Sequence, residues 1–171
     1  MPKPNTADYP EYFGRYISLV DEDDLGEAFK NQFQKIETFL RSIDEEKSNY
    51  AYAPGKWTLK ELLQHIIDGE RIFDYRALCF SRNEASSLPS FDENLYAENS
   101  NANTRSWVSL SNEFINVRRS TEDLFKSFSD AMLQQKGIAN NNSTSVLSIG
   151  FIILGHVTHH ITVVKEKYLA A

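Results

Sequence analysis

Several residue types are scarce in this chain of 171 residues, and each scarcity excludes a class of protein. The single cysteine, Cys79, cannot form an intrachain disulfide, so the sequence carries no sign of an oxidising compartment. Seven glycines and five prolines leave room for long regular elements. Lysine and arginine number 18 against 24 acidic residues, which gives a net charge of -6. This deficit argues against nucleic acid as a main partner, because phosphate contact needs concentrated positive charge.

Long hydrophobic runs are scarce as well. The most apolar stretch, Val146 to Leu154, is shorter than the roughly 20 residues that span a bilayer. The first residues lack the basic and then apolar pattern of a signal peptide. We therefore expect a cytoplasmic protein without a membrane partner. The hydrophobic fraction of 41% is enough to bury one core at this length.

Apolar residues recur at helical spacing in four segments, and no segment is convincing as a strand. The pattern predicts an all-α four-helix bundle. We place an irregular arm at 1–22 and the bundle domain at 23–171. The predicted helices cover about 23–43, 58–82, 106–128 and 143–168.

The helix boundaries carry recognisable signals. The sequence Thr58-Leu-Lys-Glu61 matches a capping box, and the acidic run from Asp21 to Asp24 suits a helix N-terminus. Polar residues at 83–104 and around 137–142 predict loops. A loop as long as 83–104 is usually functional or mobile in a compact domain.

The chain has four histidines, and three of them lie within five residues. At about 100° per residue, His156 and His160 fall inside the apolar stripe of the last predicted helix, while His159 lies at its edge. A spacing of four suits two imidazoles on one metal ion. His65 lies on the flank of the apolar stripe of the second predicted helix, from which it could point into the bundle. We therefore predict a metal site built from His65, His156 and His160, with His159 a supporting or surface residue.

Such a site would keep a coordination position open. Three protein ligands leave space for water or a thiol, whose pKa the metal would lower. The site is not the HExxH motif of metalloproteases, because Val157 follows His156 and supplies no general base. Imidazole ligands suit zinc, nickel, copper or iron. The alternative is a set of core and surface histidines that bind no metal.

Residues near His65 have two interpretations. Gly69, one turn on, either leaves room for metal, water or substrate, or is a tolerated helical glycine. Three arginines on the same helix could bind an anionic group near a pocket. We favour pairing of these arginines with acidic neighbours such as Glu70 and Asp74. The arginines are Arg71, Arg76 and Arg82.

Several motifs taken together resemble one family. The segment from Tyr52 to Arg71 reads YAPGKWTLKELLQHIIDGER, and GHVTHH runs from Gly155 to His160. These motifs resemble those of the DinB superfamily, in particular its YfiT-like branch of metal-dependent hydrolases. Members place one ligand histidine in the second helix and two more, at HxxxH spacing, in the last helix. The resemblance covers roughly residues 25–168.

The resemblance implies an up-down-down-up four-helix bundle that forms a homodimer. It also implies a divalent metal, nickel or zinc, bound by His65, His156 and His160, and a small-molecule substrate. Characterised relatives include transferases that use the low-molecular-weight thiols mycothiol, bacillithiol or glutathione, so thiol S-transfer is the expected reaction. A hydrolase that uses metal-bound hydroxide is one alternative. A non-catalytic, stress-related binding module with a structural metal is the other.

Overall fold

Four long helices form the body of the molecule in this computed structural model, which describes residues 1–169. The last two residues of the predicted domain, 170–171, lie outside the described residues. The four-helix bundle predicted from the sequence is confirmed. Its helices are α2 (Leu25–Arg41), α4 (Leu59–Ser81), α6 (Trp107–Lys126) and α8 (Val146–Val163), the last continued by the π-helical turn η4 (Val164–Tyr168).

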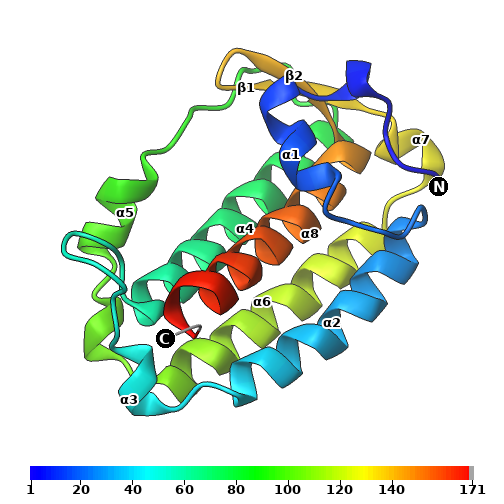
Figure 1. Ribbon diagram of the computed structural model, residues 1–171. Coiled ribbons are helices and arrows are strands. Elements are labelled where there is room, and N and C mark those ends of the chain that lie inside the picture. Colours follow the sequence, from blue (N-terminus) through cyan, green and yellow to red (C-terminus); the bar gives the residue numbers. More distant parts are fainter. Residues whose placement is uncertain (170–171) are drawn as a thin grey trace.

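The helices follow an up-down-down-up order. Helices α4 and α6 run in the same direction, and α2 and α8 run in the opposite one (Figure 1). Helix α4 packs against α6 on one side and α8 on the other, and α2 packs against the same two helices across the bundle. Since α4 and α8 are antiparallel neighbours, the first half of α4 lies beside the second half of α8. This arrangement brings His65 to the level of His156 and His160.

Short elements cover the ends and one side of the bundle. The N-terminal arm is not wholly irregular, since it contains three short helices, and the last of them, α1, packs against α8. The segment predicted as a loop at 83–104 also contains helical turns. These elements are η1 (Thr6–Asp8), η2 (Glu11–Phe13), α1 (Gly14–Ile17), α3 (Glu45–Ser48), α5 (Glu93–Asn99), η3 (Ala102–Thr104) and α7 (Asp130–Leu133).

A β-hairpin corrects the prediction of a loop around 137–142. Strand β1 (Lys136–Ala139) pairs antiparallel with β2 (Asn142–Ser145). The two turn residues, Asn140 and Asn141, have φ of 49° and 59°. A two-residue hairpin turn with both φ values positive matches the twist of its strands, and asparagine tolerates that conformation better than most residues. The strands were missed because they are only four residues long and lack a clear alternation.

Side chains cap the helices as the sequence predicts. Asp24 accepts a hydrogen bond from the backbone N–H of Glu27 at the start of α2. At the start of α4, the hydroxyl of Thr58 accepts from the backbone of Glu61, whose carboxylate accepts from the backbone of Thr58 in return. Each bond satisfies an N–H that the helix leaves free, so these residues set where α2 and α4 begin.

One helix is long and apolar enough to cross a membrane by length and composition, namely α8 with its continuation η4, Val146–Tyr168. Its apolar window is 67% buried inside the bundle. The core helix of a soluble protein passes the same test. We interpret α8 as a core helix of the bundle, because all of its residues from Val146 to Val157 are buried.

The apolar core is divided into two clusters, one at each end of the bundle. Phe80 and Phe151 belong to the cluster at the hairpin end, and Leu62 and Trp107 to the one at the opposite end. Buried polar residues occupy the level between the clusters on all four helices. They are Gln32, Glu70, Arg118, Thr121 and His156.

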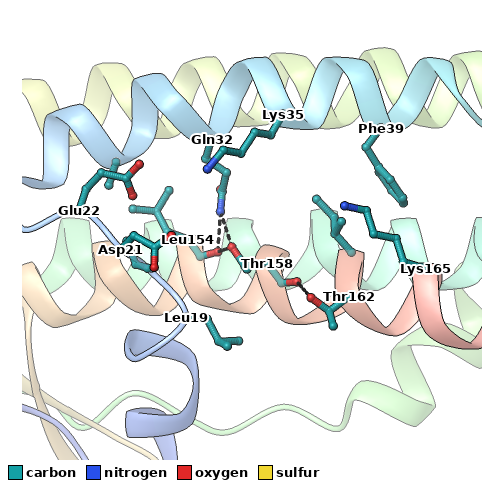
Figure 2. Close-up of a pocket in the computed structure, with 13 residues that line it drawn as sticks. Leu19, Asp21, Glu22, Gln32, Lys35, Phe39, Leu154, Thr158, Thr162 and Lys165 are labelled. Carbon is teal, nitrogen blue, oxygen red and sulfur yellow. Dashed lines mark hydrogen bonds between the residues drawn. The ribbon is translucent and has the colours of Figure 1, made fainter.

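An ion pair lies at the centre of this polar layer. Arg118, which is 0% exposed, donates from Nε and Nη2 to the two carboxylate oxygens of Glu70 at 2.9 and 2.7 Å. Its Nη1 donates to Oε1 of Gln32 at 2.7 Å. The amide of Gln32 then donates to the carbonyl of Leu154 and the hydroxyl of Thr158 on α8 (Figure 2). One continuous set of hydrogen bonds therefore joins α6, α4, α2 and α8.

We expect Arg118→Met to lower the free energy of unfolding by about 3–5 kcal/mol, because Glu70 would remain buried without a counter-ion. The double variant Glu70→Gln/Arg118→Met should recover part of the loss, since neither charge is then buried. Urea denaturation measures both. Lys126→Ala, which removes an exposed pair with Glu122, is the matched control and should change stability by less than about 0.5 kcal/mol. A loss for Arg118→Met as small as that of Lys126→Ala would contradict the central role of the pair.

Candidate metal centre

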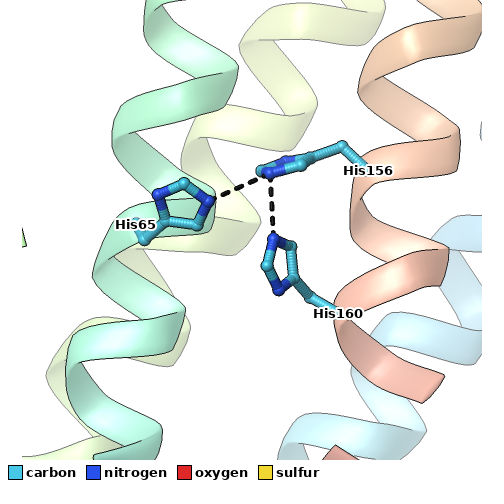
Figure 3. A group of neighbouring side chains, drawn as sticks. All are labelled: His65, His156 and His160. Atoms are coloured by element: carbon cyan, nitrogen blue, oxygen red, sulfur yellow. Dashed lines mark hydrogen bonds between the residues drawn. The ribbon is translucent and has the colours of Figure 1, made fainter. Parts of the chain in front are cut away.

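The three predicted ligand histidines meet between α4 and α8 (Figure 3). Nε2 of His156 lies 3.0 Å from Nε2 of His65 and 3.0 Å from Nε2 of His160. One ligand nitrogen from each residue lies within 4.8 Å of the other two, so the group could hold a metal ion. Sequence periodicity had placed His65 only on the flank of its helix, and the antiparallel packing of α4 and α8 turns that flank toward the other two rings.

The donor set fits a transition-metal ion. Two nitrogens that share an ion at about 2.0–2.1 Å lie about 3 Å apart, as the Nε2 atoms do. Without an ion, Nε2 of His156 carries either one proton or one lone pair, and it cannot form a well-directed hydrogen bond to two neighbours at once. Nδ1 of His160 is buried and has no protein partner. Nδ1 is not the nitrogen that meets the other rings, so it carries the ring proton while Nε2 offers its lone pair. The three converging Nε2 atoms are what an imidazole-bound metal requires.

Burial keeps these histidines neutral. Desolvation lowers the pKa of His65 to about 4, although the nearby charge of Glu93 opposes it. Desolvation also lowers the pKa of His160 to about 3, and the pKa of His156 falls well below its usual value for the same reason, helped by the neighbouring histidines. Near neutral pH each ring is therefore neutral, with one nitrogen protonated and a lone pair on the other. A metal ion would not have to displace protons to bind them.

Two glycines allow close packing around His156. A Cβ on Gly69 would lie 3.3 Å from Cε1 of His156, so this position lets the imidazole approach α4. A Cβ on Gly155 would lie 2.0 Å from the carbonyl oxygen of Tyr16, so this glycine lets α1 rest on α8. Tyr16 in turn packs edge-on against His156, with ring centroids 5.5 Å apart. Gly69 thus makes space chiefly for a ligand side chain, a role that the sequence interpretation did not include.

His159 stands apart from the group of three. Its ring packs against Tyr16, with centroids 5.5 Å apart, and lies 5.0 Å from the ring of His160. The group of residues that could hold a metal does not include it. Its position agrees with the sequence interpretation of a residue at the edge of the site.

A pocket of about 550 Å³ opens onto the histidines. Helices α4 and α8, the N-terminal arm, the segment around Phe91 and the hairpin all line it. The sequence interpretation missed the contribution of the arm and the hairpin, since nothing in their composition indicates where they dock. Trp57 also lines this pocket, with its ring 4.9 Å from that of His65. The arm residues are Pro10, Tyr12, Phe13, Arg15 and Tyr16.

A second cavity, of about 210 Å³, lies between α2 and α8 on the face where Gln32 contacts α8 (Figure 2). Its walls include Lys35 and Lys165 together with Phe39. None of the three histidines lines it. It is therefore separate from the candidate metal centre.

The arginines of α4 do not pair as the sequence interpretation favoured. Glu70 is bound by Arg118, and Asp74 contacts the hydroxyl of Thr121 at 2.7 Å. Helix α6 supplies the partners of these two acids, so the arginines of α4 make other contacts. The sequence alone does not show that α6 lies beside α4. Arg71 pairs with Glu113 at 2.7 Å, Arg76 lines the pocket, and Arg82 contacts the hydroxyl of Ser81 at 3.4 Å.

Two neighbouring acidic residues of the 83–104 segment have different roles. Asp92 accepts hydrogen bonds from the backbone N–H groups of Asn94 and Leu95 and so caps α5. Glu93 is exposed but lines the pocket, and its charge acts on His65. Cys79 is half-buried and is not among the residues that line the pocket.

The comparisons with known proteins agree with the fold. A family model of the DinB superfamily matches residues 28–164. The chain belongs to the DinB superfamily. Among solved structures, it is similar to YfiT from Bacillus subtilis, described as a probable metal-dependent hydrolase with an unusual four-helix bundle topology. The TM-score is 0.71 at 15% identity, covering 98% of this chain and 92% of YfiT. A search of the curated proteins found no significant match.

In the metal-free protein, the depressed histidine pKa values should make stability depend on pH. Between about pH 6.5 and pH 4, unfolded histidines bind protons that the folded ones do not, so His65 contributes a loss of stability as the pH falls. Each unit of pKa shift corresponds to about 1.4 kcal/mol. Asp74 acts in the opposite direction, because burial raises its pKa to about 7.

The difference between wild-type and His65→Gln protein isolates the contribution of His65 from that of Asp74. Urea denaturation at a series of pH values should show the stability of wild type falling relative to His65→Gln as the pH drops below about 6.5. His159→Gln is the control, because that ring is less deeply buried than His65 and its removal should change the slope less. Parallel curves for wild type and His65→Gln would contradict the burial argument.

Proposed function

We propose that this DinB-superfamily protein is a metal-dependent enzyme whose ion, nickel or zinc, is bound by His65, His156 and His160. The observation that carries the proposal is the convergence of three neutral imidazoles where a pocket of about 550 Å³ opens. A structural site would be closed by a fourth protein ligand, and a site with three leaves a position for a reactant. The candidate group contains no fourth histidine, cysteine or carboxylate among the described residues.

The reaction that fits best is transfer of a low-molecular-weight thiol, such as bacillithiol, mycothiol or glutathione, to an electrophile. A bound divalent ion would lower the pKa of a thiol beside it and so supply a nucleophile near neutral pH. The thiol proton would pass to solvent, the sulfur would form a bond to an electrophilic carbon, and the leaving group would depart with the electrons of the broken bond. Such a transfer needs no general base from the protein.

The residues of the chain would contribute position and environment. Burial keeps the imidazoles of His156 and His160 neutral, so their lone pairs are available. Trp57 and Tyr16 pack beside the rings of His65 and His156 and restrict their rotation. The rest of the pocket offers aromatic surface for the electrophile.

Hydrolysis is the second candidate, because one residue could serve as its proton acceptor. Glu93 lines the pocket, and its charge acts on His65. In that reaction Glu93 would accept a proton from the attacking water. YfiT is described as a probable metal-dependent hydrolase, which supports this alternative.

We expect His156→Ala to bind zinc or nickel more weakly by a larger factor than the roughly 10–100-fold that loss of a supporting hydrogen bond costs. Metal analysis of purified protein and competition with a chromogenic chelator measure this. Conjugation of thiols to a panel of electrophiles should be lost in the same variant. His159→Ala is the matched control and should retain both metal and activity. A wild-type protein that binds neither metal would contradict the proposal.

Glu93→Gln separates the two reactions. If the protein transfers thiols, the variant should keep its turnover to within about a factor of two to three, because the thiol proton goes to solvent. If it hydrolyses esters or amides, turnover should fall by about 100-fold or more, the usual contribution of a general base. Repeating the same assays with and without thiol distinguishes the two reactions independently, because only the transfer requires a thiol. Metal removal that lowers only the melting temperature, with no activity in any assay, would favour the non-catalytic module.

A further inference from the structure

The charges that line the pocket are unequally distributed. Two cationic side chains, Arg15 and Arg76, line it together with one acid, Glu93. The charge of Glu93 acts on His65, so this acid belongs to the end of the pocket nearest the histidines. Arg15 is exposed, and its guanidinium already contacts the hydroxyls of Tyr12 and Tyr16. Arg76 is therefore the cation that lacks a comparable set of partners.

Arg76 is half-buried without a counter-ion. Its Nη2 donates to the carbonyl oxygen of Pro89 at 2.9 Å, and no carboxylate of the described residues lies within ion-pairing distance of it. Three other arginines do have counter-ions, since Arg71 and Arg105 pair with Glu113 and Arg118 pairs with Glu70. Burial lowers the pKa of Arg76, and no nearby acid opposes that effect. A partly desolvated guanidinium with free donors is suited to a ligand anion.

The route from the histidines to Arg76 is apolar. Phe73 lies between them, with its ring 6.4 Å from the ring of His156 and 5.7 Å from Cζ of Arg76. Gly69, Phe73, Arg76 and Phe80 all line the pocket from one face of α4. Gly69, which leaves space for the ring of His156, lies two helical turns before Arg76, or about 10 Å along the axis.

We propose that the pocket binds an elongated ligand with an apolar body and a terminal carboxylate, and that Arg76 binds this carboxylate about 10 Å from the histidines. The apolar body lies along Phe73, and the opposite end of the ligand faces His65, His156 and His160. The inference rests on the proposed function only in saying which end of the ligand reacts. The carboxylate contact itself involves only Arg76 and needs no metal.

A carboxylate fits this end of the pocket better than a phosphate ester does. A carboxylate carries one charge and matches one planar guanidinium. A phosphate ester carries about two charges and three strong acceptor oxygens, which call for further cations. Among the described residues that line the pocket, the other arginine is Arg15, and it is engaged with Tyr12 and Tyr16 on the N-terminal arm.

Calorimetric titration of the metal-free protein tests the contact without metal coordination by the probe. The probes are phenylacetate, phenylbutyrate and phenylhexanoate, each paired with its uncharged primary amide and with the phosphate monoester of similar length. The ratio of carboxylate to amide affinity isolates the charge contact from apolar burial. Arg76→Gln and Arg76→Lys are the variants. Arg71→Gln is the matched control, since Arg71 lies on the same helix but pairs with Glu113 outside this pocket.

We expect wild type and Arg71→Gln to prefer the carboxylate over its amide by about tenfold or more, the usual strength of a charged hydrogen bond. Arg76→Gln should abolish the preference while amide binding stays unchanged, and Arg76→Lys should keep part of it. No saturable binding of any probe, a preference unchanged in Arg76→Gln, or tighter binding of the phosphate ester would each overturn the inference.

Zinc titration on the same protein keeps the two proposals apart. Failure of zinc to bind, with the carboxylate preference intact, would overturn the metal-dependent function and leave the carboxylate site standing. Zinc binding that is lost in His156→Ala, together with no carboxylate preference, would overturn only the inference about Arg76.

Discussion

The buried ion pair between Arg118 and Glu70 is the interaction on which the arrangement of the site depends. Both side chains lie between the two apolar clusters, where either charge alone would be strongly destabilising. The pair is satisfied only when α6 and α4 stand at one height, and the bond from Arg118 to Gln32 extends the same requirement to α2. Gln32 then contacts α8 at Leu154, two residues before His156. The height of the ligand-bearing part of α8 is thereby matched to that of α4.

An apolar layer at this level would hold the bundle together but would specify its register less strictly. Apolar helix faces gain similar free energy in several registers, whereas hydrogen bonds and buried charges are satisfied in one. A shift of α8 by a single turn would move His156 by about 5 Å along the helix axis relative to His65. The Nε2 atoms that now lie 3.0 Å apart would then separate. The polar layer thus costs desolvation free energy, and in return it fixes the helix register that places the three imidazoles together.

The local features of the chain could be predicted because their causes are local. Apolar spacing identified the four helices, Thr58 and Glu61 marked the start of α4, and angular position separated His156 and His160 from His159. The features that were missed depend on partners distant in sequence. Nothing near Glu70 in the sequence points to Arg118 as its partner, so the acids of α4 were assigned to the wrong arginines. Space beside His65 was one of two interpretations of Gly69, and the use of that space by a ring 87 residues away required the tertiary structure.

The placement of the histidines and the wall of the pocket depend on different kinds of segment. The helices carry the histidines, whose positions tolerate little error, and the polar layer holds those helices in register. The N-terminal arm, the segment around Pro89 and the hairpin carry much of the pocket wall and contribute no candidate metal ligand. Arg76 connects the helices to the wall segments, since it projects from α4 and donates to the carbonyl of Pro89. A substitution in the wall segments can therefore change what the pocket accepts while the three histidines stay in place, which is how one bundle can serve several substrates.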